Sequence, residues 1–111
     1  MNKTTACAIL AVTLSLTASD AQAASFNCAY AKLPAEVAIC NDEELGSLDV
    51  PMSRLYYSDI HKLPWEQVTE VKAEQKAFIK ERNACGSDDV CITDSYNARI
   101  ERLNFWADWQ G

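Results

Sequence analysis

The stretch QKAFIKERNACGSDDVCITDSYNARIERL, residues 75–103, decides the fold of this chain. It begins and ends in helical patterns, and between them lies the short segment CGSDDVC, residues 85–91. Gly86 is a natural helix terminator, because glycine adopts a left-handed backbone at no steric cost. The ends of two helices joined by such a turn converge within disulfide-bridging distance. We therefore predict a helical hairpin in which a disulfide between Cys85 and Cys91 joins the adjoining ends of the two helices.

Apolar residues on both sides of this turn recur at helical spacing. The longest predicted helix runs from Trp65 to Ala84 and carries on its inner face Val68, Val71, Gln75, Phe78 and Ile79. The next helix begins near Val90, and its core face carries Ile92, Tyr96, Ile100 and Leu103, with Phe105 and Trp106 near the end. Two placements stay open for Trp106 and Trp109, which either pack on the bundle or form an exposed contact patch.

Two further helices precede the hairpin. Residues 34–39 suit a short helix, because Pro34 stands near its start, where a missing N–H costs nothing. Asn41 or Asp42 can cap a second helix, whose apolar stripe is Leu45, Leu48, Met52 and Leu55, widened by Tyr56 and Ile60.

Pro51 interrupts the second of these helices. A proline in a helix interior costs about 3 kcal/mol, so we expect a kink or a restart there, with Asp49 as a new N-cap. Leu63 and Pro64 then end the helix. Together, the four predicted helices form a small antiparallel all-α bundle.

The N-terminus predicts export. A lysine at position 3, the apolar run of residues 6–16 and the small residues of Ala21-Gln22-Ala23 form the three-part pattern of a signal peptide, cleaved before Ala24. The alternative, a buried helix or a membrane anchor, is disfavoured because spanning a bilayer takes about 20 apolar residues. We predict a leader over residues 1–23 and one mature domain over residues 24–111. It would be periplasmic or secreted, with no membrane anchor.

Four cysteines remain after the leader: Cys28, Cys40, Cys85 and Cys91. An even count in a short exported chain predicts structural disulfides. Three pairings are possible, and the hairpin geometry favours the local one, 28–40 with 85–91, over the crossed ones. Neither spacing suits structural zinc, the only histidine is His61, and there is no C-x-x-C motif. No metal or cofactor is expected.

The formal net charge of −6 limits the possible partners. An acidic surface disfavours nucleic acid and anionic lipid and is compatible with a basic protein partner. The alternative is that the charge serves only solubility, as in many exported proteins. Two acidic clusters are candidate contacts, Asp42-Glu43-Glu44 and Asp88-Asp89. The alternative for both is capping of helix N-termini together with ordinary solvated charge.

Residues spread over nearly the whole mature chain carry a family resemblance. The early ones are Ser25 to Ala29, Pro34 to Glu36, Ile39, Cys40, Leu45, Leu48, Asp49, Leu55 and Tyr56. The later ones are Gln75 to Ile79, Glu81, Arg82, Cys85, Gly86, Cys91, Tyr96 to Ile100 and Leu103. Together they resemble the LprI-like family, which comprises a lysozyme inhibitor and its relatives. This chain departs at Phe78, where relatives commonly carry tryptophan, and at Pro51, where relatives usually continue the helix.

The resemblance implies an exported helical domain and, less directly, inhibition of lysozyme. The functional prediction is a lysozyme-inhibitor-like protein that binds a basic cell-wall hydrolase. The alternative is an accessory module of the cell envelope with another protein partner. An enzyme is disfavoured, because His61 has no evident serine or cysteine partner. Arg82 or Arg99 is expected to pair with an acid at a helix interface, a structural role.

Overall fold

The computed structural model describes residues 24–111, so the predicted leader and its cleavage site lie outside the described residues. The elements are a 3-10 turn, η2 (Cys28–Tyr30), and the helices α1 (Pro34–Asn41), α2 (Glu43–Lys62), α3 (Trp65–Ala84) and α4 (Asp89–Ala107). Residues 24–111 form no β-strand. The predicted all-α bundle is therefore confirmed, and the predicted span of α3 is correct, although α2 is equally long at 20 residues.

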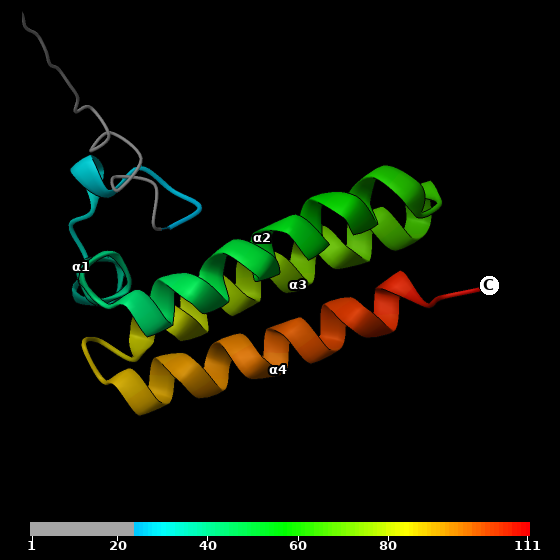
Figure 1. Ribbon diagram of the computed structural model, residues 1–111. Helices are drawn as coiled ribbons and strands as arrows, with labels where there is room; N and C mark the ends of the chain where they lie inside the picture. The colour runs from blue at the N-terminus through cyan, green and yellow to red at the C-terminus, as the bar shows by residue number, and fades with distance from the viewer. Residues whose placement is uncertain (1–23) are drawn as a thin grey trace, which may run out of the picture.

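The three long helices lie alongside one another, and α1 crosses one end of the bundle near the start of α2 (Figure 1). Only Leu63 and Pro64 separate α2 from α3, so α3 must fold back antiparallel to α2. The turn at residues 85–88 reverses the chain again, and Gly86 takes a φ of 62° there. As a result α4 runs in the same direction as α2 and packs against both α2 and α3.

The core is built from one face of each helix. Its buried apolar residues are Ala24, Ala35, Ile39, Leu45, Met52, Val71, Phe78, Ile92, Tyr96, Leu103 and Trp106. Each large side chain of this kind contributes about 1.5–3 kcal/mol through burial. The predicted core position of Ile79 is wrong, because its side chain is 38% exposed, beside the groove between α2 and α3. Both late tryptophans pack on the bundle, Trp106 buried and Trp109 partly buried.

The restart predicted at Pro51 is wrong, since α2 is a single helix from Glu43 to Lys62 with Pro51 inside it, and the kink stays a prediction. Pro51 lies on the exposed face, where water can bind the Ser47 carbonyl that loses its partner. Asp49 is not an N-cap but a fully buried residue, whose carboxylate accepts a hydrogen bond from the Tyr96 hydroxyl. Asp42 alone caps α2, accepting from the backbone N–H groups of Glu44 and Leu45.

Both disulfides form in the local pairing. Cys28 and Cys40 join η2 to α1 with a Cα–Cα distance of 5.8 Å, and Cys85 and Cys91 join the ends of α3 and α4 at 5.6 Å. In the loop-entropy account each bridge stabilises the fold by about 2–3 kcal/mol, a large contribution for a domain of this size. Within residues 24–111, no helix has the length and apolar character to cross a bilayer.

Candidate functional site

The two acidic clusters predicted from the sequence stand at the first turns of α2 and α4. Asp42 and Asp88 are helix caps, and the Asp88 carboxylate accepts from the Cys91 N–H at 3.1 Å. Glu43, Glu44 and Asp89 are exposed, and none forms an ion pair with a described residue. Capping therefore accounts for Asp42 and Asp88, and the other three carboxylates face solvent, which the alternative of ordinary solvated charge also expects.

The parallel course of α2 and α4 brings these clusters to the same end of the bundle. Figure 1 shows the first turns of both helices at the end where the α3–α4 turn lies. Clusters that are far apart in the sequence thus share one acidic end of the molecule. The sequence predicted the clusters but not their convergence, which depends on the direction of α4.

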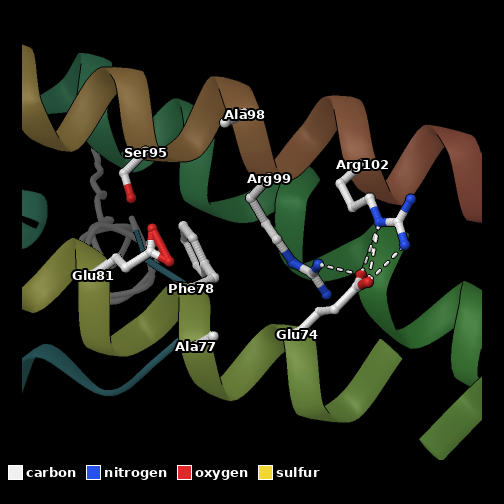
Figure 2. Close-up of a pocket in the computed structure, with 8 residues that line it drawn as sticks. All are labelled: Glu74, Ala77, Phe78, Glu81, Ser95, Ala98, Arg99 and Arg102. Carbon is white, nitrogen blue, oxygen red and sulfur yellow. Dashed lines mark hydrogen bonds and ion pairs between the residues drawn. The ribbon is translucent and has the colours of Figure 1, made fainter. Parts of the chain in front are cut away.

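A slot of about 260 Å³ opens between α3 and α4. Ala77 on α3 and Ala98 on α4 lie on opposite walls, and the Phe78 ring forms the apolar part between them (Figure 2). The slot exists because two alanines face each other there, leaving space that larger side chains would fill. Small residues at these positions gave no signal in the sequence, because alanine is common on helix surfaces.

One end of the slot is closed by a fixed polar cluster. Arg102 donates to both carboxylate oxygens of Glu74, with its Nη2 2.7 Å from Oε2, and the indole Nε1 of Trp106 donates to Oε1 at 2.9 Å. Partial burial acts to raise the pKa of Glu74, but the hydrogen bonds from Arg102 and Trp106 outweigh it and lower that pKa. Glu74 is therefore ionised at neutral pH and fully engaged.

The buried Arg99 guanidinium completes this cluster. Its Nε donates to Gln75 Oε1 at 2.8 Å, its Nη2 to the Val71 carbonyl at 3.2 Å, and its Nη1 lies 3.4 Å from Glu74 Oε1. Burial lowers the pKa of Arg99, and the neighbouring Glu74 opposes that shift. The predicted pairing of Arg99 with an acid at a helix interface is confirmed.

Glu81 and Ser95 stand at the opposite end of the slot. Figure 2 shows both side chains beside Phe78, one on α3 and the other on α4. Glu81 is exposed, and no described cation lies within ion-pairing distance of its carboxylate. The Ser95 hydroxyl forms no hydrogen bond to a side chain or backbone group of residues 24–111. This end of the slot therefore offers a carboxylate and a hydroxyl to a ligand.

A second polar cluster is centred in the core on Asp49 and Tyr96, which are fully buried. The Tyr96 hydroxyl donates to Asp49 Oδ1 at 2.6 Å and accepts from Arg82 Nη1 at 3.2 Å, while the Ser25 N–H donates to Asp49 Oδ2. Arg82 Nη1 lies 3.9 Å from Asp49 Oδ1. Burial raises the pKa of Tyr96, and the Asp49 charge adds to that shift. These groups join α2, α3 and α4, and Arg82 and Ser25 also line a cavity of about 390 Å³ beside α2 and α3.

His61 lies outside this network. Its Nδ1 is 2.6 Å from the Tyr57 carbonyl oxygen on the preceding turn of α2, and the side chain is exposed. All four cysteines of the described chain are in disulfides. Across residues 24–111, no three His, Cys, Asp or Glu side chains gather as a metal site requires.

Comparison with models of known protein families, with curated proteins and with solved structures gave no match to this chain. The resemblance to the LprI-like family stays a prediction. The chemistry of the acidic end and of the slot therefore carries the functional assignment.

Proposed function

We propose that this protein is exported and binds a basic cell-wall hydrolase of the lysozyme kind, inhibiting it. The observation that carries the proposal is the placement of the exposed carboxylates. Glu43 and Glu44 in the first turn of α2 and Asp89 in the first turn of α4 are exposed at the same end of the bundle as the α3–α4 turn, which is also the end nearer Glu81 (Figure 1). A cationic protein would be drawn to this end first.

The cell compartment supports this assignment. Structural disulfides persist in oxidising compartments, and a domain of this size gains much of its stability from them. The predicted leader gives the route of export, and the periplasm or the exterior is where a cell-wall hydrolase acts. The resemblance to the LprI-like family points to the same class of partner.

A binding role also suits the polar groups of the interior better than catalysis does. Asp49, Tyr96 and Arg82 have the chemical types used in acid–base reactions, but each is nearly or fully buried, and together they hold three helices in place. We therefore propose a binding protein rather than an enzyme.

A lysis assay tests the proposal. The purified exported protein is added to cell-wall suspensions together with basic lysozymes of several classes. We expect the protein to inhibit lysozyme. We expect rising salt to weaken this inhibition, because salt screens exposed charges. The variant Glu43→Gln/Glu44→Gln/Asp89→Asn keeps both helix caps and should slow association. Undiminished activity of every lysozyme class at micromolar excess of the protein would refute the proposal.

An accessory module for another envelope protein is the second candidate. This candidate is favoured because the acidic end of the bundle can attract many kinds of cationic protein, not lysozymes alone. Affinity capture from periplasmic extract, with the triple variant as the matched control, separates the two candidates. Recovery of a protein other than a lysozyme, lost in the triple variant, would support the accessory role.

A further inference from the structure

We infer that the slot between α3 and α4 is an anchor site for one arginine or lysine side chain of the protein partner. The aliphatic stem would lie against Ala77, Phe78 and Ala98, and the cation would meet Glu81 and Ser95. This inference deepens the proposed function and rests on it for the identity of the partner. The recognition of a cationic side chain can be tested without that partner.

The dimensions of the slot suit a single side chain. Pockets for drug-sized molecules usually hold about 300–1,000 Å³, and this slot holds about 260 Å³. Its walls come from two neighbouring helices, with Ala77 on α3 and Ala98 on α4 both exposed, as expected of a site that receives a side chain from a protein surface. Arginine and lysine carry an apolar stem and a charged tip, which matches an apolar floor with a carboxylate at one end.

The distribution of engaged and open polar groups fixes the orientation of the occupant. At one end Glu74 is already held by Arg102 and Trp106, so it has little capacity for a further cation. At the other end the Glu81 carboxylate is without an ion partner in the described chain, and Ser95 adds a hydroxyl acceptor. A cation bound there forms charge-assisted hydrogen bonds, which are stronger than neutral ones.

The charge on the other face of α3 argues for this slot over the neighbouring groove. A cavity of about 500 Å³ lies between α2 and α3, and its rim carries Lys72 and Lys76. Like charges would repel a cationic side chain from that groove. The slot also carries Arg99 and Arg102, but both are paired with Glu74 at one end, so the Glu81 end is the part that complements a basic side chain.

The first test uses a probe in place of the partner. Nitrogen-15-labelled exported protein is titrated with N-acetyl-arginine amide and, as a neutral isostere, N-acetyl-citrulline amide. We expect saturable amide shifts at Ala77, Glu81, Ser95 and Ala98 with the arginine probe only, at a dissociation constant on the order of millimolar. Equal binding of both probes would overturn the inference, as would arginine shifts confined to the acidic clusters.

Three variants sharpen this test. Glu81→Gln should weaken the arginine probe about tenfold, the effect of one lost charge-assisted contact. Ala98→Leu fills the slot without changing charge or helix propensity and should abolish binding. Glu66→Gln removes an exposed carboxylate from the first turn of α3, outside the slot, and should leave the affinity unchanged. An unchanged affinity in Glu81→Gln would refute the cation assignment.

The same variants separate this inference from the proposed function. In a complex with a basic lysozyme, Glu81→Gln and Ala98→Leu should raise the dissociation rate, because anchors act mainly on that rate. If lysozymes are inhibited and both variants dissociate like the wild type, the anchor inference fails and the proposed function stands. If the arginine probe binds the slot and no lysozyme is inhibited, the proposed function fails and the cation-recognising slot stands.

Discussion

Replacing Asp59 with asparagine should stabilise this protein at neutral pH. Asp59 is fully buried on α2, and neither of its carboxylate oxygens has a hydrogen-bond partner in the described residues. Burial raises the pKa of this carboxyl, although the charges of Lys62 and Arg99 oppose the shift. An unpartnered buried polar group costs about 1–3 kcal/mol. Asparagine keeps the shape and removes the charge but leaves a polar amide unpaired, so only the cost of burying the charge is relieved and we expect a gain of about 1 kcal/mol in the free energy of unfolding.

The stabilisation by Asp59→Asn should increase as the pH rises from acidic to neutral. The pKa of Asp59 in the folded state lies above its unfolded value near 3.8. The stability contributed by neutral Asp59 is therefore fully present below pH 3.8 and is lost as the pH rises through the folded pKa. The advantage of Asp59→Asn should be largest at neutral pH and should shrink toward acidic pH. All other titrating groups are common to both proteins and cancel in the difference.

Urea unfolding of both proteins at neutral and acidic pH measures this difference. In a domain of this size each kcal/mol also moves Tm by roughly 4–8 °C, so thermal melts give a second readout. Asp94→Asn, an exposed acid on α4, is the matched control and should change stability by less than about 0.5 kcal/mol at either pH. A variant less stable than wild type at neutral pH, or a difference that does not vary with pH, would refute the reasoning.

Three further changes test the interior and the disulfide. Tyr96→Phe removes the hydroxyl that donates to Asp49 and should cost about 1.5–3 kcal/mol in urea unfolding, with the helical circular dichroism retained. Replacing Cys85 and Cys91 together by serine should cost about 2 kcal/mol, measured by thermal melting, and the reduced wild type should be less stable still because it also loses Cys28–Cys40. Glu74→Gln should cost about 1–3 kcal/mol at neutral pH. Because the folded pKa of Glu74 is lowered, that loss should vanish as the pH falls through it, as urea unfolding across acidic pH can check.

Local signals explain which parts of the fold could be predicted. The hairpin at residues 85–91 was predictable because Gly86 and two cysteines act within one turn. Pro51 misled the prediction because the cost of a helical proline depends on whether water reaches the freed carbonyl. The role of Asp49 was unpredictable for a stronger reason. Its partner Tyr96 lies 47 residues away on another helix, and no local pattern reports such a contact.

Some features of the candidate site could likewise be predicted from the sequence, and others could not. The acidic clusters were visible in the sequence because charge and helix starts are local properties. The slot was not visible, since its space arises where Ala77 and Ala98 meet across two helices. The open carboxylate of Glu81 could not be told from an ordinary solvated charge until the positions of the arginines were known.

The arginine contacts explain how so small a bundle can hold an open slot without collapsing into it. Apolar contacts alone let neighbouring helices slide and rotate, because they have no fixed direction. Arg99 donates to Gln75, Glu74 and the Val71 carbonyl, acceptors that span more than one turn of α3. Such directional contacts fix both the height and the rotation of α4 on α3. Because the Cys85–Cys91 bridge holds the other end, the slot is already formed in the free protein, and binding of the proposed partner would lose little free energy to ordering the site.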